Sequence, residues 1–495
     1  MVSPPVRGRK TGTSGSGHTV AMRTVEDDLE VLASGLGSRP ERPAKVIIVG
    51  AGMAGLVAAS ELLKAGHEPI VLEAQQRVGG RVLTLREPFA PGLWAEAGAM
   101  RIPKTHRLTH ALIERYGLVT KPFTMDNDAT YCMFGGNRVR RTEVHGDPTV
   151  LGFEVSEHER RPPGDLWSAE LAPFVARLNA EGDEGWTAIA AEYDQYAVRE
   201  FLELRSWSEG AIEMFGLLFN QEALMNSSFL ELLREELGSY YTDLVYLEGG
   251  TDHLPRAFIP ELAQHIRFGA KMTALEQSAD DVTVHYRTGA GRFSVTGDSV
   301  IMTVPFPVLR HVEVLTPFSR AKQRAIRQLH YDASAKVFLQ FRRRFWEDDD
   351  GIVGGGSVTD LAVRNVYYPD HGRDTGRGVM LASYTWGEDA QRWGSLSPED
   401  RCVQALEDVA RLHPQAIEDF EVGASKMWHD DEFAGGAFAL FDPGQQTLLY
   451  DAICAPEGRV HFAGEHASLA HAWIQGAIES GIRAAVEVHE RAIRA

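Results

Sequence analysis

A glycine-rich turn at residues 50–55, with the sequence GAGMAG, constrains the fold of this 495-residue chain more than any other feature. It follows a β-branched run from Lys45 to Val49, which predicts a strand. Helical periodicity begins at Met53 and ends at Lys64, just before an Ala-Gly pair. A second apolar run, from Pro69 to Leu72, predicts another strand. This order of strand, glycine turn, helix and strand is typical of a Rossmann-type dinucleotide-binding unit.

Each residue type in this unit has a physical role in binding a dinucleotide. Gly50 permits a tight turn, Gly52 lets a pyrophosphate approach bare backbone, and Gly55 lets helix and strand pack closely. Free N–H groups at the start of the helix attract the anion. Glu73 ends the second strand, where its carboxylate can accept hydrogen bonds from ribose hydroxyl groups.

The residues that follow favour FAD over a nicotinamide dinucleotide. Gly79, Gly80 and Arg81 come soon after Glu73, where a nicotinamide enzyme usually begins its next helix. Far downstream lie the segments FAGEH at 462–466 and WIQGAIESG at 473–481. Together with the glycine turn, these motifs resemble the flavin-containing amine oxidase superfamily, and the resemblance covers about residues 44–490.

The resemblance implies an FAD site made from segments at both ends of the chain. Glu465 is expected to reach the ribityl region, and Met272 lies where the family holds adenine through backbone groups. A helix that begins near Trp473 is expected to stabilise the negative charge of reduced flavin. The predicted FAD contacts are Gly50, Gly52, Met53, Ala54, Gly55, Glu73, Ala74, Gly80, Arg81, Gly98, Ala99, Met100, Arg101, Met272, Trp428, Gly464, Glu465, Trp473, Ile474 and Ala477.

The FAD is expected to be non-covalent. Some amine oxidases attach it through the cysteine of a Gly-Gly-Cys-Tyr turn, whereas the matching turn here is Gly-Gly-Ala-Phe, with Ala437 in place of the cysteine. No thioether can form at that position.

A Met-Arg-Ile-Pro run that contains Arg101 resembles the L-amino-acid oxidase branch of the superfamily, in which this arginine binds the substrate carboxylate. The planar fork of arginine suits that role because it makes two parallel bonds to a carboxylate. The resemblance also implies that Tyr384 reaches the same carboxylate and that Lys336 holds a water near the flavin. The predicted catalytic residues are Lys336, Arg101, Tyr384 and Trp473.

The same resemblance implies that the Ala472 carbonyl takes the substrate amine and that Trp473 forms a wall of the site. Glu235 falls near the position of a residue that lines the entrance in related oxidases; the alternative is a solvated glutamate on an outer helix face. A carboxylate facing the entrance would pair with basic side chains of substrates. The predicted substrate-binding residues are Arg101, Tyr384, Ala472, Trp473, Phe438, Trp428 and Glu235.

The predicted fold class is α/β, or α+β over the whole chain: a Rossmann-type FAD-binding domain built from discontinuous segments, a mixed-sheet substrate domain and a helical insert domain. An amphipathic helix is expected over Thr24 to Leu36. The expected ranges are a flexible N-terminal arm at 1–43, the FAD-binding domain at 44–82, 245–330 and 445–495, the substrate domain at 83–139 and 331–444, and the helical domain at 140–244.

The expected reaction is oxidation of an L-amino acid by FAD and dioxygen to a 2-oxo acid, ammonia and hydrogen peroxide. Broad specificity for large side chains is expected, with poor use of aspartate and glutamate and no turnover of D-isomers. An amino-acid 2-monooxygenase, which yields a decarboxylated amide, a dehydrogenase and an amine oxidase remain alternatives. A flavin-binding scaffold protein without turnover is the non-enzymatic alternative.

Composition bears on partners and location. Acidic residues outnumber basic ones 69 to 50, and a net charge of −19 disfavours nucleic acid and anionic membranes as partners. The longest apolar run, Val46 to Ala59, is too short to span a bilayer, and no signal peptide is recognised, so a cytoplasmic protein is expected. A homodimer or larger homo-oligomer is expected from the resemblance.

Neither a disulfide framework nor a metal site is expected. The three cysteines, Cys132, Cys402 and Cys454, are scattered and odd in number, which favours idle thiols. His466 and His471 are five residues apart and would not share a helix face, so structural or solvent roles are expected for both.

Overall fold

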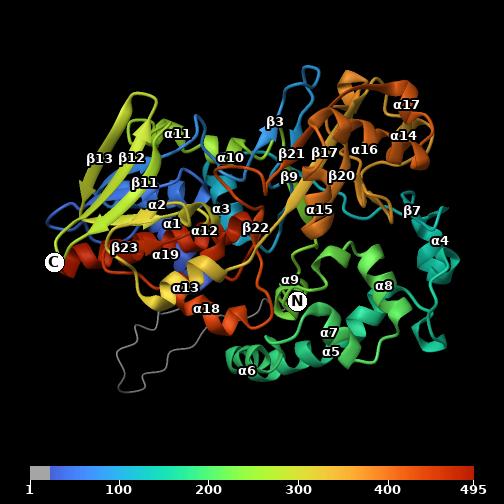
Figure 1. The fold of residues 1–495 in the computed structure, drawn as a ribbon, viewed down its shortest axis with the longest axis horizontal. Coiled ribbons are helices and arrows are strands. Elements are labelled where there is room, and N and C mark those ends of the chain that lie inside the picture. The colour runs from blue at the N-terminus through green and yellow to red at the C-terminus, as the bar shows by residue number, and fades with distance from the viewer. Residues whose placement is uncertain (1–22, 495) are drawn as a thin grey trace.

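The structure is a computed structural model that describes residues 23–494 (Figure 1). Residues 1–22 of the expected N-terminal arm lie outside the described residues. The amphipathic helix expected next to them is α1 (Val25–Ser34), which begins with a capping box made by Thr24 and Asp27. Val31 and Leu32 are buried, so this helix packs on the main body.

A five-stranded parallel sheet forms the centre of the first domain. Its neighbours come from three distant parts of the chain, which confirms the predicted Rossmann-type domain of discontinuous segments. The strand order is β10 (Ile266–Arg267), β2 (Glu68–Leu72), β1 (Lys45–Val49), β14 (Ser299–Met302) and β23 (Val460–Phe462).

The two faces of this sheet are covered differently because side chains alternate along β1. Val46 and Ile48 pack against α2 (Met53–Lys64) and α19 (Ile474–Arg494). Ile47 and Val49 face a second sheet. That sheet has the order β13 (Gly291–Gly297), β12 (Val282–Thr288), β11 (Lys271–Gln277) and β15 (Glu313–Val314).

A seven-stranded sheet is the centre of the second domain. One of its pairs, β18 with β7, is parallel and the others are antiparallel, which confirms the predicted mixed sheet. Helix α16 (Pro398–Leu412) packs against it. The order is β21 (Phe420–Met427), β17 (Ser334–Phe341), β20 (Gly378–Trp386), β19 (Asn365–Tyr367), β18 (Gly356–Thr359), β7 (Tyr131–Phe134) and β8 (Asn137–Arg140).

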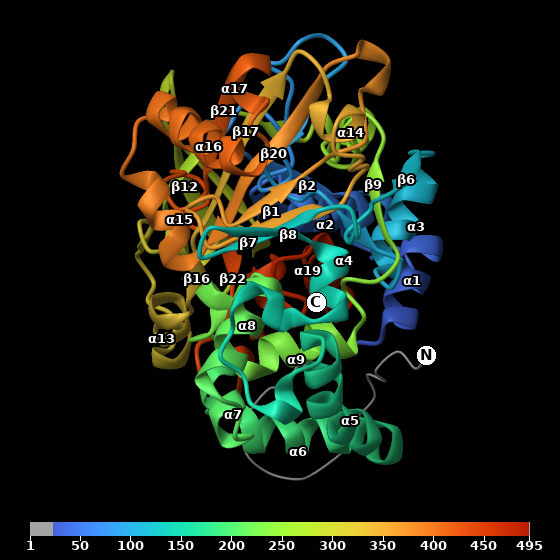
Figure 2. The same ribbon diagram turned by 90° about the vertical axis from the view of Figure 1, so that its right-hand side faces the viewer.

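The helical insert has a core of its own, rich in aromatic rings such as Phe201 and Phe229, which stack 3.7 Å apart. Figure 2 shows it at the end of the molecule opposite α16, with the strands of the parallel sheet in between. Its helices are α4 (Arg141–Gly146), α5 (Pro163–Glu181), α6 (Asp183–Tyr193), α7 (Val198–Leu204), α8 (Glu209–Leu218) and α9 (Phe229–Leu237). The chain then returns to the main body through β9 (Leu244–Leu247).

Candidate functional site

A cavity of about 920 Å³ lies where the parallel sheet, the seven-stranded sheet and the helical insert meet. Its wall includes Glu73 from the first of these, Lys336 from the second and Glu235 from the third. Every site residue that the sequence predicts lines this cavity, with the exception of Gly55. The sequence motifs therefore converge on one place in the fold.

The glycine turn has the geometry that a dinucleotide needs. A Cβ on Gly55 would lie 2.0 Å from the carbonyl oxygen of Gly50, so this glycine serves close packing and not ligand contact. A Cβ on Gly52 would meet no atom within 4 Å, and no side chain caps the N-terminus of α2 that begins there. The free N–H groups of α2 thus border open space, which suits a pyrophosphate.

Glu73 lies at the carboxyl end of β2, and its carboxylate is buried and already held in place. Its Oε2 accepts a hydrogen bond from the Ala51 N–H at 2.7 Å, and its Oε1 accepts one from the Gln75 N–H at 2.8 Å. Burial raises its pKa. Each carboxylate oxygen has room for a second hydrogen bond, so the position fits a ribose diol.

Glu465 joins three segments of the cavity wall. Its Oε1 accepts from the Arg81 guanidinium at 2.7 Å, and Arg81 also donates to the Ala437 carbonyl at 3.0 Å. The N–H groups of Ala439 and Ala472 donate to the same carboxylate at 3.2 and 3.1 Å. Glu465 therefore organises the wall, with less of its carboxylate free for a ligand than the resemblance implies.

Lys336 lies opposite Tyr384 in the pairing of β17 with β20, and only 2% of it is exposed. Its Nζ donates to the carbonyls of Glu96 at 3.0 Å and Gly98 at 2.7 Å, and lies 4.5 Å from the centre of the Tyr384 ring. Burial lowers its pKa to about 7, opposed by the neighbouring Glu96 carboxylate. Burial likewise raises the pKa of Glu96 to about 7. Both groups therefore titrate near neutral pH.

Arg101 is 8% exposed and lies beside β5 (Ile102–Pro103) on the cavity wall. It donates to the Met125 sulfur at 3.2 Å and to the Tyr367 hydroxyl at 3.4 Å, and stacks 5.2 Å from the Tyr241 ring centre. Within residues 23–494, no carboxylate lies in ion-pair distance of this guanidinium. A buried cation without a partner charge is costly, so the site favours an anionic ligand.

The end of the cavity beside the helical insert combines Glu235 with the segment around Ala472. The Trp473 indole donates to Glu235 Oε1 at 2.8 Å, and the Tyr241 hydroxyl donates to Oε2 at 2.8 Å. Glu235 thus faces the cavity and not the outer solvent, which decides between the two alternatives for its location. Ala472 has a φ of 65°, an uncommon value for a residue other than glycine.

The aromatic wall is formed by Phe438 and Trp428, both predicted. The Trp428 indole donates to the Ala97 carbonyl at 2.7 Å, which fixes the ring. Met272, predicted near adenine, is buried in β11 and also lines the cavity.

The sequence analysis assigned no place in the site to His471, which lines the cavity. His471, for which a structural or solvent role was expected, is 4% exposed and lines the cavity, with its Nδ1 2.8 Å from Glu231 Oε1. A solvent role for it is wrong. His466 is fully buried and packs 4.6 Å from the Phe306 ring, a structural position. The acidic residues within 231–236 are visible in the sequence, but the sequence does not show that one of them, Glu231, contacts His471.

The described residues of the cavity wall include no cysteine and no cluster that could hold a metal ion. The three cysteines are free, and none lies on the cavity wall. In the described part of the chain, no group of three or more His, Cys, Asp or Glu side chains could hold a metal ion. None of the helices over residues 23–494 has the length and apolarity to cross a membrane.

Two solved structures have a fold similar to that of this chain. A triple mutant of putrescine oxidase superposes with a TM-score of 0.74 at 24% identity, over 91% of this chain and 99% of that chain. Cyclohexylamine oxidase from Brevibacterium oxydans IH-35A gives 0.70 at 20% identity, over 92% and 99%. At this identity the likeness shows the fold alone.

Sequence relatives extend over nearly the whole chain. YobN of Bacillus subtilis (strain 168), whose name as an L-amino-acid oxidase is provisional, is 39% identical over 472 residues, covering 94% of this chain and 98% of the relative. An L-amino-acid oxidase from Siganus canaliculatus is 36% identical over 458 residues, covering 90% and 86%. One from Vipera ammodytes ammodytes is 35% identical, covering 94% and 96%. A family model described as flavin containing amine oxidoreductase matches residues 53–489. The chain belongs to the flavin-containing amine oxidoreductase family.

Proposed function

We propose that this protein is an FAD-dependent L-amino-acid oxidase that converts L-amino acids to 2-oxo acids with release of ammonia and hydrogen peroxide. Relatives at 35–36% identity carry the name L-amino-acid oxidase, which supports this branch of the family. FAD is the proposed flavin because the glycine turn, Glu73 and the cavity fit a dinucleotide.

The buried Arg101 is the observation that carries the proposal. An amine substrate without a carboxylate would leave this buried guanidinium without a partner charge. The carboxylate of an amino acid satisfies it through two charge-assisted hydrogen bonds. Tyr384, on the same wall, can donate a third hydrogen bond to that carboxylate.

The residues of the chain then orient the substrate. Arg101 and Tyr384 hold the carboxylate, the Ala472 carbonyl accepts from the amine, and Trp473 confines the substrate between them. Bound FAD supplies the hydride acceptor and, with dioxygen, the route to hydrogen peroxide. Positioning of the Cα–H bond is the main contribution of the protein, because no side chain has to remove that hydrogen as a proton.

Large side chains are the proposed preference. Phe438 and Trp428 offer an apolar wall, and Glu235 adds a carboxylate that can attract the distal charge of arginine or lysine. The same carboxylate repels aspartate and glutamate, which are expected to be poor substrates.

Attachment of the cofactor is proposed to be non-covalent, since Ala437 occupies the turn that carries cysteine in some relatives and the cavity wall contains no cysteine. A cytoplasmic location and a homodimeric state are further proposals. Cell fractionation and light scattering of the purified protein test them.

The decisive experiment compares L-phenylalanine with phenylethylamine, which lacks only the carboxylate. L-Phenylalanine should bleach the yellow protein without oxygen, and in air it should yield phenylpyruvate and hydrogen peroxide in equal amounts. Bleaching by phenylethylamine alone would instead indicate a simple amine oxidase, and the decarboxylated amide as product would indicate a 2-monooxygenase. A yellow protein that neither compound reduces would contradict both oxidase assignments.

A further inference from the structure

Helix α9 presents two glutamates, one turn apart, to the same short segment of the cavity wall. Glu231 accepts from the His471 ring at 2.8 Å, and Glu235 accepts from the Trp473 indole at 2.8 Å. Residues four apart on a helix lie on one face. The two glutamates therefore hold the two neighbours of Ala472 from the same side.

Ala472 needs such support because its backbone is strained. Its φ of 65° lies in the left-handed region, which a residue with a Cβ adopts only where the surrounding structure holds it there. The third support is Glu465, whose Oε2 accepts from the Ala472 N–H at 3.1 Å. Carboxylates thus hold the residue itself and both of its neighbours.

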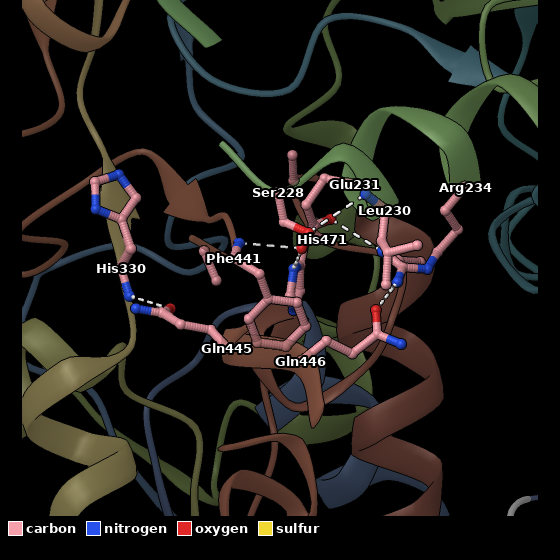
Figure 3. Close-up of polar contacts among 12 residues, drawn as sticks. Ser228, Leu230, Glu231, Arg234, His330, Phe441, Gln445, Gln446 and His471 are labelled. Carbon is pink, nitrogen blue, oxygen red and sulfur yellow. Dashed lines mark hydrogen bonds and ion pairs between the residues drawn. The ribbon is translucent and has the colours of Figure 1, made fainter. Parts of the chain in front are cut away.

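Glu231 is held by further protein contacts besides His471. Its Oε1 also accepts from the Phe441 N–H at 3.0 Å, and its Oε2 accepts from Arg234 at 3.0 Å. Figure 3 shows the carboxylate between the His471 ring and the Phe441 backbone, and Arg234 continuing to Gln446. Glu231 is 6% exposed and lies on the cavity wall, where these protein groups hold its carboxylate.

Glu231 makes no contact with the residues around Arg101, although Glu235 does so through Tyr241. Met125 and Tyr367 belong to the substrate domain, and neither touches Glu231. A change at Glu231 therefore reaches the amine end of the site through His471, while the carboxylate end keeps its own supports.

We propose that Glu231 is a positioning residue: with Glu235 it makes α9 a clamp that sets the Ala472 carbonyl for the substrate amine. Within this clamp Glu231 acts independently of the carboxylate site at Arg101, whereas Glu235 also binds Tyr241, whose ring lies beside Arg101. The inference rests on the proposed function, because it assigns the amine end of that site. It also gives the helical insert a direct part in substrate orientation, in addition to forming the entrance.

The test is Glu231→Gln in the FAD-loaded enzyme, which keeps the size of the side chain and removes its charge. Two probes separate the two ends of the site: L-phenylalanine, followed by anaerobic flavin reduction, and benzoate, a carboxylate without an amine, followed by the flavin absorbance change. We expect the apparent Kd of L-phenylalanine to rise about 10-fold. The Kd of benzoate should change less than about 2-fold.

A matched control is Glu213→Gln on α8, an exposed glutamate of the same insert, which should leave both constants unchanged. The double variant Glu231→Gln, His471→Gln should be no worse than the more affected of its single variants, because both changes break one contact. Flavin content and circular dichroism report whether each variant is folded.

Three outcomes would overturn the inference. If Glu231→Gln weakens the binding of both probes equally, Glu231 is a general structural residue. If it leaves the binding of L-phenylalanine unchanged, Glu231 has no positioning role. Additive losses in the double variant would show that the two side chains act separately. If the unaltered protein is not reduced by any L-amino acid, the proposed function fails and this inference with it; an active parent with an unaffected variant refutes the clamp alone.

Discussion

Replacing Lys336 by Met is expected to make the protein more stable and a poorer oxidase at neutral pH. Burial lowers the pKa of this lysine from 10.5 to about 7. At about 1.4 kcal/mol for each pKa unit, its buried charge destabilises the fold by about 5 kcal/mol. Methionine has a similar length without the charge, but it leaves the Glu96 and Gly98 carbonyls without this donor. At about 1–2 kcal/mol for each carbonyl, a net gain of about 1–3 kcal/mol remains.

The pH dependence distinguishes this account from better packing. Below pH 7 the lysine is charged in both the folded and the unfolded protein, and the full penalty is present. Between pH 7 and 10.5 the unfolded state binds more protons than the folded state, so the stability of the parent rises with pH. The advantage of the Met variant should therefore shrink through this window, by about 1.4 kcal/mol for each pH unit, and reverse at about pH 8–9.

Thermal unfolding at pH 6 to 10, monitored through the fluorescence of released flavin, measures the stability difference between the variant and the parent. Stopped-flow absorbance measures the two half-reactions, of which reoxidation by dioxygen should slow more than reduction by substrate. A variant that is less stable than the parent at pH 6, or a stability difference that does not vary with pH, would refute the argument from the buried charge. Intact reoxidation would leave Lys336 with a structural role only.

Four further results are expected. Arg101→Ala should raise the KM for L-amino acids through the loss of about 2–5 kcal/mol of binding with little change in flavin content, and Arg101→Lys should recover part of it; unchanged steady-state kinetics would contradict the carboxylate site. Acid precipitation should release all the flavin into the supernatant, because Ala437 cannot form a thioether; yellow pellets would contradict this. Gly55→Ala should lose FAD, measured as the flavin-to-protein ratio, since its Cβ would lie 2.0 Å from a backbone oxygen. Glu235→Gln should raise the KM for L-arginine and L-lysine more than for L-phenylalanine; an equal rise for all three would leave Glu235 with a structural role only, through its contacts with Trp473 and Tyr241.

Individual helices can be predicted from the sequence where the residues that start and end them lie within or next to the helix itself. The helix expected from Met53 to Lys64 has these bounds in the structure, since its glycine turn and its C-terminal Ala-Gly pair mark both ends. The amphipathic helix after Thr24 is likewise present. In such segments, capping residues, glycines and apolar periodicity all favour the same structure.

The partners of the site residues could not be predicted, because they lie far apart in the chain. A lysine within an apolar strand indicates that some group must satisfy it, but nothing in residues 334–341 identifies the Glu96 and Gly98 carbonyls, which are more than 230 positions away. The contact between Glu231 and His471 spans 240 positions. The sequence predicts that Glu235 is near the entrance, whereas its hydrogen bond to Trp473 depends on how α9 docks.

The interleaved parallel sheet has a consequence for folding during synthesis. Strand β1 ends at Val49, but its sheet is completed by β23, which begins at Val460. Residues 50–459 have to be made in between, which takes roughly 20–80 s at about 5–20 residues per second. Until then the apolar faces of β1 and α2 lack the cover of α19, while the helical insert can already close its own core. The nascent chain therefore has to wait for its last helix before it can retain a flavin, and chaperones have that interval in which to protect it.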